Sequence, residues 1–355
     1  MIDKVIARGI EEISRNFNVR DCVEDKRIIV TGGAGFIGSW LCDVLVENGA
    51  ELVLCVDNLA SGLRENISHL LERENFSFIK HDISKPLEID GRVDAILHLA
   101  SRASPLEFEK FPIQIVKANT IGTWIALGIA KRKHARLLFA STSEVYGDAE
   151  VIPTPENYNG NVSCVGVRSC YDEAKRCGEA LCKAYERQHN LDVRIARIFN
   201  TYGPRMRAEG VYGRVIPRFI HQVLSGKPIT IFGDGHQTRS FCYITDQIEG
   251  LLRLLCVEDA RGAVVNIGSP QEIEILKLAA VVQRIAARKV PLEFLPALPD
   301  DPRRRCPDIT RARTLLGFEP KVSLEEGLRL TFEWFKEKFE VESNRRGVSG
   351  GRVSA

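Results

Sequence analysis

The stretch IIVTGGAGFIGSWL, residues 28–41, decides the fold of this chain. It starts as a short apolar run, passes through a glycine-rich turn and continues at helical spacing. Its glycines fit G-x-G-x-x-G (Gly33, Gly35, Gly38) and also G-x-x-G-x-x-G (Gly32, Gly35, Gly38). Glycine permits a tight turn and lets backbone N–H groups approach a pyrophosphate at the N-terminus of a helix. The stretch therefore predicts a dinucleotide-binding strand–turn–helix unit, and a turn that only packs the helix on the strand is the plainer alternative.

Short apolar runs and helical patterns alternate after this turn. The expected strands are residues 52–57, 76–82, 95–100, 136–140 and 193–199. The expected helices are residues 36–48, 64–73, 111–131 and 169–189. Strands that alternate with helices indicate βαβ units and a parallel sheet. We therefore predict an α/β fold with a Rossmann-type doubly wound parallel sheet and a smaller C-terminal lobe of mixed α/β structure.

Changes of pattern along the chain predict four segments. The first is an amphipathic helix that packs on the core or on a partner, because Ile2, Ile6, Ile10, Ile13 and Phe17 stand at helical spacing. After residue 200 glycine and proline become frequent, strands such as 229–233 are short, and a closing helix is expected at 323–339. The predicted segments are an N-terminal helix extension (1–25), a dinucleotide-binding Rossmann domain (26–200), a second lobe that partly returns to the Rossmann domain (201–340) and a disordered tail (341–355).

The composition is that of an ordinary soluble globule, with 44% hydrophobic and 27% charged residues. A net charge of +2 over 355 residues is too small to suggest a nucleic-acid partner. The ten cysteines include no C-x-x-C pair and no Cys/His cluster at zinc spacing, so we predict no metal site. They favour a reducing compartment, although a structural disulfide stays open. We find no signal peptide and no membrane-spanning run, and expect a cytoplasmic protein without a membrane partner.

An acidic residue follows the second predicted strand at the position that a dinucleotide site needs. Asp57 stands nineteen residues after Gly38. Its carboxylate can accept a hydrogen bond from the adenosine ribose and would repel a 2′-phosphate, so the sequence favours NAD over NADP. Asp82, which ends the third predicted strand, is expected to lie near the adenine.

A tyrosine and a lysine on one helical stretch form the candidate catalytic pair. Tyr171 and Lys175 are four residues apart in SCYDEAKR and therefore share a helix face. A free tyrosine has a pKa of about 10 and is a poor base at neutral pH. A nearby ammonium group and a nicotinamide cation would both lower that pKa. In STSEVYG, which follows the predicted strand 136–140, Thr142 or Ser143 can hydrogen-bond a hydroxyl that is being oxidised.

These motifs carry a resemblance to a known family. TGGAGFIG, Asp57, Thr142, Tyr171 and Lys175 resemble the extended short-chain dehydrogenase/reductase superfamily. More narrowly, the chain resembles the UDP-glucuronate decarboxylases, in HLASRASP, KANTIGT, STSEVYG, SCYDEAKR, RIFNTYGPRM, IFGDGHQTRSF and DDPRRRCPDI. The similarity runs from about residue 26 to residue 339. It implies that the second lobe binds a nucleotide sugar.

The resemblance also implies a reaction. Tyr171 would deprotonate the sugar 4-hydroxyl while NAD takes hydride from C4. The ketone is β to the C6 carboxylate, so carbon dioxide leaves, and protonation at C5 and return of hydride give UDP-xylose. Glu144 matches the position that orients the ring and supports proton transfer. Arg305 matches a position near C5 and the carboxylate.

Binding positions follow from the same resemblance. The catalytic set is Thr142, Glu144, Tyr171, Lys175 and Arg305. The cofactor set is Gly32, Gly35, Phe36, Ile37, Gly38, Asp57, Asn58, Asp82, Ile83, Leu99, Ala100, Tyr171 and Lys175. The substrate set is Arg102, Asn119, Ser143, Asn200, Arg214, Val215, Phe232, Arg239 and Arg305. Among these, Phe232 would stack on uracil, Arg239 would pair with the diphosphate, and Asn119 would lie on the nicotinamide side.

The sequence departs from the family pattern at three positions. Arg102 replaces the first proline of Ser-Pro-Ala-Ser-Pro and would reach the substrate carboxylate or signal a different sugar. Cys306 replaces a lysine, and Ala174 replaces a common glycine. A UDP-sugar 4-epimerase, a nucleotide-sugar 4,6-dehydratase and a non-catalytic NAD-binding protein therefore stay as alternatives. Related enzymes imply a homodimer in which helices 111–131 and 169–189 form a four-helix bundle.

Overall fold

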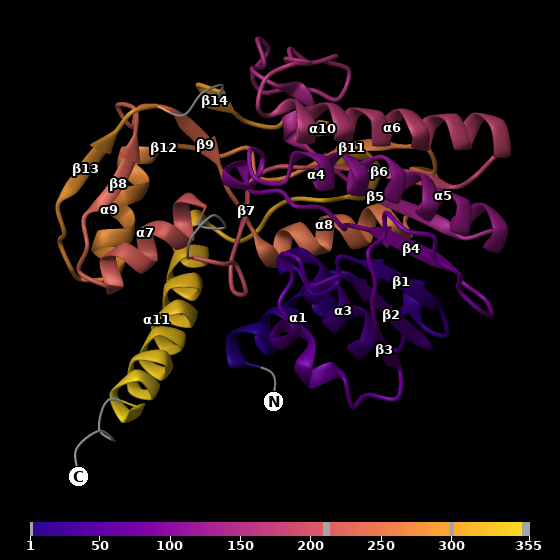
Figure 1. The fold of residues 1–355 in the computed structure, drawn as a ribbon, viewed down its shortest axis with the longest axis horizontal. Helices are drawn as coiled ribbons and strands as arrows, with labels where there is room; N and C mark the ends of the chain where they lie inside the picture. Colours follow the sequence, from indigo (N-terminus) through magenta and orange to yellow (C-terminus); the bar gives the residue numbers. More distant parts are fainter. Residues whose placement is uncertain (1–2, 209–213, 298–301, 350–355) are drawn as a thin grey trace.

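The main body is a seven-stranded parallel sheet with helices on both faces (Figure 1). The computed structural model describes residues 3–208, 214–297 and 302–349. The strands run in the order β11-β6-β5-β4-β1-β2-β3. Their bounds are β1 Arg27–Thr31, β2 Leu52–Asp57, β3 Phe76–Lys80, β4 Ala95–His98, β5 Arg136–Thr142, β6 Val193–Ile198 and β11 Val264–Ile267. The order reverses between β1 and β4, which creates a crevice at the carboxyl ends of these strands. The predicted Rossmann-type sheet is confirmed.

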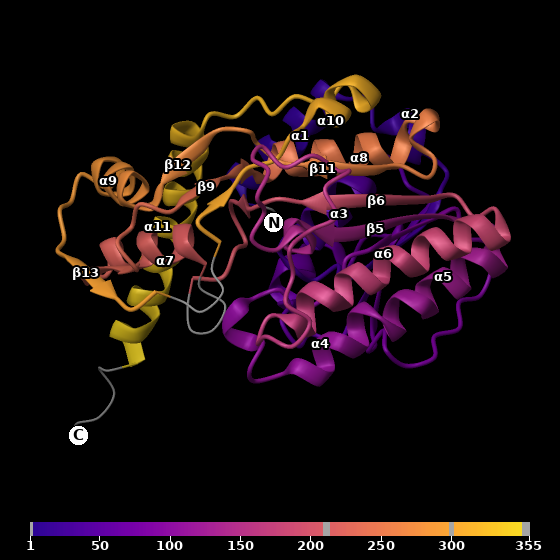
Figure 2. The same ribbon diagram turned by 90° about the horizontal axis from the view of Figure 1, so that it is seen from above.

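Two helical layers cover the sheet, and Figure 2 shows them on opposite sides. One layer holds α1 (Lys4–Asn16), α3 (Phe36–Glu47), α8 (Ile244–Cys256) and α10 (Thr310–Leu316). The other holds α4 (Pro112–Asn119), α5 (Ile121–Lys133) and α6 (Ser169–His189). The helices of each layer pack their apolar residues on one face of the sheet. The body therefore has two separate hydrophobic clusters, one on each face. The inner strands β1, β2, β4 and β5 are buried on both faces, as parallel strands between helices must be, whereas the edge strand β3 is partly exposed.

A smaller lobe stands beside the carboxyl ends of the strands (Figure 1). Its helices are α7 (Val215–Leu224), α9 (Ile275–Ile285) and the start of α11 (Leu324–Ser349). Its strands are β8 (Ile229–Phe232) with β13 (Leu292–Leu295), and β9 (Thr238–Ser240) with β12 (Glu272–Glu274) and β14 (Arg304–Arg305). The pair β7 (Thr201–Tyr202) and β10 (Cys242–Tyr243) joins this lobe to the body. The chain returns to the large sheet through α8 and β11.

The N-terminal segment packs on the body. Ile6, Ile10 and Ile13 of α1 are buried in the core, so the expected amphipathic helix is present. A disulfide joins Cys22 of α2 (Arg20–Val23) to Cys256 at the end of α8. The sequence analysis had left open whether any cysteines form a disulfide, and the structure contains this one. The cytoplasmic location stays a prediction.

Three local predictions are corrected. Residues 64–73 were expected to be an α-helix, but Arg64–Leu70 form a 3-10 helix. The tail from 341 was expected to be disordered, but α11 continues to Ser349, and residues 350–355 lie outside the described part. No membrane-spanning run was expected, but Pro112–Lys133 is long and apolar enough to cross a membrane by length and composition alone. In the fold this stretch forms α4 and α5, which pack with α6.

Candidate active site

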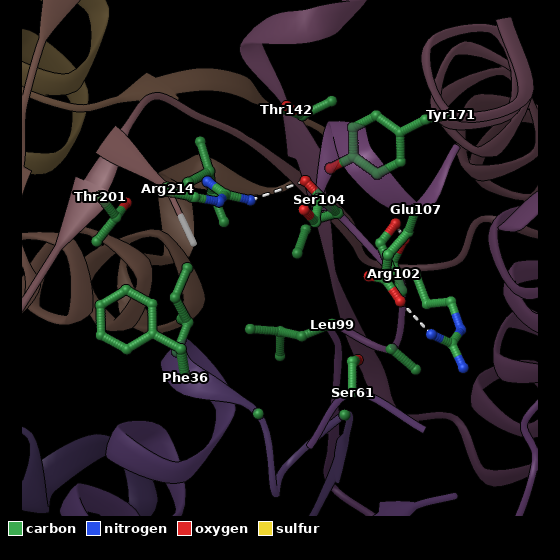
Figure 3. Close-up of a pocket in the computed structure, with 18 of the residues that line it drawn as sticks. Phe36, Ser61, Leu99, Arg102, Ser104, Glu107, Thr142, Tyr171, Thr201 and Arg214 are labelled. Atoms are coloured by element: carbon green, nitrogen blue, oxygen red, sulfur yellow. Dashed lines mark hydrogen bonds and ion pairs between the residues drawn. The ribbon is translucent and has the colours of Figure 1, made fainter. Parts of the chain in front are cut away.

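A cavity of about 770 Å³ lies between the carboxyl ends of the sheet strands and the small lobe. Figure 3 shows Tyr171 and Thr142 toward one end of it, and Phe36, Leu99 and Ser61 toward the other. All the predicted catalytic residues line it. So do the predicted cofactor positions, which are Gly32, Gly35, Phe36, Ile37, Gly38, Asp57, Asn58, Asp82, Ile83, Leu99 and Ala100. The crevice where the strand order reverses is the usual ligand site of such a sheet.

The glycine-rich turn can fold this tightly only because its residues lack a Cβ. Gly32 has a φ of +72°, and a Cβ there would meet the backbone N of Ala100 at 2.9 Å. A Cβ on Gly38 would lie 2.2 Å from the carbonyl oxygen of Gly32. Gly33 instead packs inward, where a Cβ would meet the Cys55 sulfur at 2.6 Å, and it does not line the cavity. The G-x-x-G-x-x-G interpretation is therefore the one that fits.

Asp57 is anchored at the end of β2 beside this turn. Its Oδ2 accepts a hydrogen bond from the Ala34 N–H at 3.0 Å, and its Oδ1 accepts one from the Leu59 N–H at 2.8 Å. Burial raises its pKa, and the two backbone hydrogen bonds oppose that shift. A glycine turn at a helix start, followed by a fixed carboxylate on the next strand, suits a dinucleotide with a free ribose 2′-hydroxyl.

Tyr171 is buried near the start of α6. Its ring stacks on Phe108, with the centroids 5.2 Å apart. Burial raises the pKa of Tyr171 to about 12, while the charge of Arg214 and a hydrogen bond with Thr142 act to lower it. The tyrosine is therefore a protonated phenol at neutral pH unless a further positive charge reaches it.

Lys175 does not supply that charge in this structure, contrary to the expectation from the sequence. Its Nζ donates a hydrogen bond to the Ala140 carbonyl oxygen at 2.6 Å and lies 5.9 Å from the centroid of the Tyr171 ring. Burial lowers the pKa of Lys175 to about 7. The two side chains share a helix face as predicted, but the protein alone does not produce a low phenol pKa.

Glu144 and Arg305 form a bidentate ion pair, although they are far apart in the sequence. The two guanidinium nitrogens lie 2.5 Å and 2.7 Å from the carboxylate oxygens. Arg168 pairs with the same carboxylate. Burial acts to raise the pKa of Glu144, but the charges of Arg305 and Arg168 outweigh it and hold the pKa below its usual value. Glu144 is therefore ionised at neutral pH and can only accept hydrogen bonds.

The small lobe supplies the other wall of the cavity. Arg214 donates to the Ala103 carbonyl oxygen at 2.9 Å, which joins the lobe to the loop after β4. The buried Nδ2 of Asn200 has no hydrogen-bond partner among the described residues, so a ligand acceptor could complete it. Besides Arg214 and Asn200, the substrate positions that line the cavity are Arg102, Ser143, Val215, Phe232, Arg239 and Arg305.

Two residues that were predicted to contact the substrate have protein partners instead. Asn119 does not line the cavity: its Nδ2 donates to Ser101 Oγ at 3.0 Å and to the Ile115 carbonyl oxygen at 2.9 Å, behind the wall. In this structure Asn119 positions Ser101 rather than lining the cavity itself. Arg102 lines the cavity, but its guanidinium pairs with Glu107 and lies over the Phe111 ring.

Two arginines of the cavity were missed by the sequence analysis. Arg168 binds Glu144 and stands one residue before SCYDEAKR, so its closeness to that motif was the available signal. Arg218 lies over the Phe232 ring, 4.8 Å from its centroid, and burial lowers its pKa to about 10. No motif marked Arg218. Among the described residues no cluster of His, Cys, Asp and Glu could hold a metal ion.

Residues 28–268 match the model of the NAD dependent epimerase/dehydratase family. The chain belongs to this family. The matched range includes the glycine turn, Asp57, Thr142, Tyr171 and Lys175. Glu144 also lies in the matched range, whereas Arg305 lies beyond it.

Individual relatives narrow the comparison. The chain is 47% identical over 327 residues to UDP-glucuronic acid decarboxylase 5 of Arabidopsis thaliana, which covers 92% of this chain and 94% of that protein. It is 48% identical over 323 residues to UDP-glucuronic acid decarboxylase 1 of Danio rerio, covering 91% and 76% of the two chains. Among solved structures, the UDP-glucuronic acid 4-epimerase of Bacillus cereus with UDP-glucuronic acid and NAD is similar, with a TM-score of 0.79, 32% identity and coverage of 88% and 99%.

Proposed function

We propose that the chain catalyses the NAD-dependent decarboxylation of UDP-glucuronate to UDP-xylose through a transient 4-keto sugar. The observation that carries this proposal is the Glu144–Arg305 pair in the cavity that also holds Thr142 and Tyr171. An epimerase needs only the threonine, tyrosine and lysine. The similarity to UDP-glucuronic acid decarboxylases over about nine-tenths of the chain supports the same substrate.

The cofactor would lie on the glycine turn, with its adenosine ribose at Asp57. Gly32, Gly35 and Gly38 line the cavity in a tight turn, and the anchored carboxylate supplies the acceptor. NAD would accept hydride from C4 and return it within one turnover. Tyr171 takes the proton of the C4 hydroxyl, and Thr142, its hydrogen-bond partner, orients that hydroxyl. Because the phenol is protonated in the protein alone, positive charge beside it is a condition of the reaction.

Glu144 and Arg305 act on the other side of the sugar. The ionised Glu144 accepts hydrogen bonds from the ring and can accept a proton during the reaction. Arg305 brings a fixed positive charge to the carboxylate that leaves as carbon dioxide. Arg168 pairs with Oε2 of Glu144, which also accepts from Arg305, and so helps to keep the carboxylate in place.

A product assay tests this function. Purified protein is incubated with NAD and, separately, with UDP-glucuronate, UDP-glucose or UDP-galactose, and products are followed by proton NMR. We expect UDP-xylose from UDP-glucuronate with no net NADH. Interconversion of UDP-glucose and UDP-galactose, with UDP-glucuronate unchanged, would mean that the chain is a 4-epimerase. NAD binding without turnover of any of the three would favour a non-catalytic protein.

The helices α4, α5 and α6 support a homodimer as part of this proposal. Ile113, Val116, Ile121 and Trp124 are exposed on α4 and α5, and this apolar surface suits a second copy of the chain. The paired helices of two copies would form a four-helix bundle. Light scattering after gel filtration should give a dimer for the wild type and a monomer for Trp124→Glu. Val341→Glu, an equally apolar and exposed position on α11, serves as the control and should stay dimeric.

A further inference from the structure

Glu107 is a buried carboxylate in the cavity wall that the proposed reaction does not use. It ends the 3-10 turn Pro105–Glu107, in the loop between β4 and α4. Its side chain is 1% exposed, and it lines the cavity. Buried carboxylates are rare unless they are paired or bind a ligand, so its position needs an explanation.

Arg102 neutralises one side of this carboxylate. Nη1 of Arg102 pairs with Oε1 of Glu107. The Arg102 guanidinium lies over the Phe111 ring, 4.1 Å from the centroid, which fixes the arginine as well. Figure 3 shows this guanidinium on the side of Glu107 away from the centre of the cavity. The pair therefore places a carboxylate in the cavity wall without adding a net negative charge there.

The second oxygen of Glu107 has no partner. Oε2 is buried and makes no hydrogen bond within the described residues. The next residue, Phe108, stacks on Tyr171, so this loop has a fixed position relative to the catalytic tyrosine. A buried acceptor that is held rigidly and left unpaired, in a cavity wall beside the reacting group, is suited to a donor from the ligand.

We propose that Oε2 of Glu107 accepts a hydrogen bond from a ring hydroxyl of the sugar, which makes Glu107 a substrate-binding residue. The inference rests on the proposed function, since it names a further contact of the same UDP-sugar. An ion-paired carboxylate accepts only, and sugar hydroxyls are the donors that a nucleotide sugar brings to this part of the cavity. Arg102 is then a positioning residue. Its positive charge offsets the repulsion between the Glu107 carboxylate and the carboxylate of the substrate.

Binding of UDP-glucuronate to NAD-loaded protein tests the proposal. All variants are made in a Tyr171→Phe background, which blocks turnover, and dissociation constants are measured by calorimetry. We expect Glu107→Gln to raise the Kd for UDP-glucuronate by about ten-fold, because a charge-assisted hydrogen bond is weakened. The matched control is Glu109→Gln, an exposed glutamate two residues away, which should stay within about two-fold of the parent. The Kd for NAD should not change.

A double variant separates a substrate contact from a structural ion pair. Arg102→Met with Glu107→Leu removes both charges, which a folded protein tolerates better than the loss of one partner. We expect its Kd for UDP-glucuronate to stay raised by about ten-fold, because the acceptor is gone. Recovery to the parent value would overturn the proposal, as would an unchanged Kd in Glu107→Gln or an effect on NAD alone.

The experiment also distinguishes failure of the Glu107 contact from failure of the proposed reaction. Binding is measured without turnover, so Glu107 can be shown to contact UDP-glucuronate even if the wild-type enzyme proves to be an epimerase. Failure of the wild type to bind UDP-glucuronate at all would overturn both proposals.

Discussion

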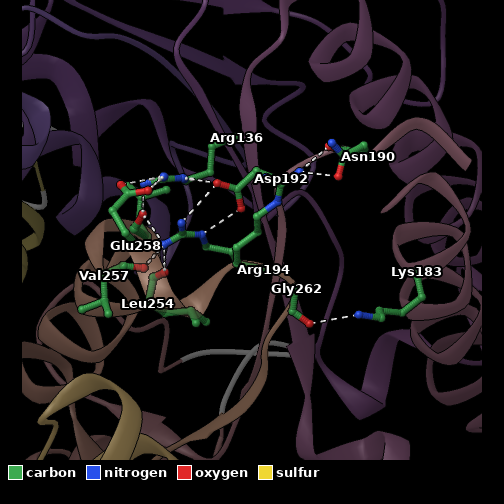
Figure 4. Close-up of polar contacts among 11 residues, drawn as sticks. Arg136, Lys183, Asn190, Asp192, Arg194, Leu254, Val257, Glu258 and Gly262 are labelled. Atoms are coloured by element: carbon green, nitrogen blue, oxygen red, sulfur yellow. Dashed lines mark hydrogen bonds and ion pairs between the residues drawn. The ribbon is translucent and has the colours of Figure 1, made fainter. Parts of the chain in front are cut away.

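Two clusters of arginines and carboxylates lie at opposite ends of the same strands and serve different purposes. At the carboxyl end of β5, Glu144 is held by Arg305 and Arg168 in the cavity wall. At the amino ends of β5 and β6, Arg136 and Arg194 share Asp192 (Figure 4). Residue types are the same in both clusters, so composition alone does not tell them apart.

The cluster at the amino ends is a helix cap. Arg194 is fully buried, and its Nη1 donates to the carbonyl oxygens of Leu254, Leu255 and Val257 at 2.9, 3.0 and 2.5 Å. These carbonyl groups lie at and just after the end of α8, where a cation suits the helix dipole; Leu255 also accepts from Arg136, and Val257 also accepts from the Ala260 N–H. The carboxylate of Asp192 accepts hydrogen bonds from Nε and Nη2 of Arg194. Every charge there has a protein partner, so nothing is left for a ligand.

The cluster in the cavity differs in its charge balance. Two guanidinium groups surround the single carboxylate of Glu144, and the charge of Arg239 reaches it as well. The excess positive charge faces a cavity and attracts an anionic ligand. A cluster of charged residues indicates a binding site when its charges are unbalanced and face a cavity. It indicates a structural role when every charge is paired with another side chain or with the backbone.

The largest effect is expected from Glu144→Gln. The amide loses the negative charge and accepts a proton poorly, so kcat with UDP-glucuronate should fall about 10²- to 10⁴-fold. The Arg305 and Glu144 side chains are only 9% and 15% exposed, so loss of the charge should also lower the free energy of unfolding by about 3 kcal/mol. Glu150→Gln, at an exposed position nearby, is the control and should keep full activity. A variant that keeps its kcat but unfolds much more easily would place Glu144 with the structural cluster.

Arg194→Met should affect stability alone. Removing the guanidinium leaves Asp192 Oδ1 and the Leu254 carbonyl without the donor that Arg194 gives them and takes away one charge partner of Asp192, so the free energy of unfolding should fall by about 3 kcal/mol. The kcat of the folded protein should not change. Urea unfolding followed by circular dichroism measures the loss, with the exposed Arg187→Met as control. A fall in kcat at unchanged stability would contradict the cap assignment.

A smaller, pH-dependent effect is expected at the edge of the cavity cluster. Burial and the charge of Glu144 raise the pKa of Asp172 to about 7, against the opposing charges of Arg168 and Arg305. In the unfolded chain the group ionises near pH 4, so between about pH 4 and 7 the folded state binds more protons. Its contribution to stability is therefore present below pH 4 and is lost as the pH rises through 7. Asp172→Asn should gain stability relative to wild type over that interval, and a difference that shrinks with rising pH would be evidence against this.

The smallest effect belongs to Glu258→Gln in the structural cluster. Both Glu258 oxygens accept from Arg136 Nη2, at 2.8 and 2.9 Å. The side chain is nevertheless 80% exposed, so solvent screens the pair and the loss should be below about 1 kcal/mol. Thermal unfolding measures it. A loss as large as that of Arg194→Met would show that the contribution of these contacts to stability depends on their distances rather than on burial.

The elements that sequence predicted well are those with a strong local pattern. Six strands of the sheet were predicted because each is a short apolar run between turns, and α6 was predicted to the residue. The seventh strand, β11, was not predicted. It is four residues long and lies far along the chain, in a region whose pattern suggested only a mixed lobe. Its place at the sheet edge depends on pairing with β6.

The residues of the site were also predicted well only where they belong to a local pattern. Gly32, Gly38 and Asp57 follow from spacing, because a phosphate turn and a ribose acceptor need fixed positions along one βαβ unit. Asn119 was assigned to the ligand incorrectly, since a motif does not say which face of its helix meets the cavity. Arg168 was missed because a single arginine before a helix has no distinguishing pattern.

The sequence by itself determined the main strands of the sheet and the glycine-rich turn, and it predicted a catalytic set whose members all line one cavity. Local pattern and the chemistry of residue types are enough for these. Only the tertiary structure decided that Glu144 and Arg305, 161 residues apart, form one pair, that Lys175 turns to Ala140, and that Arg102 serves Glu107. Contacts between distant segments depend on how the two lobes close the cavity, and no local pattern encodes that packing.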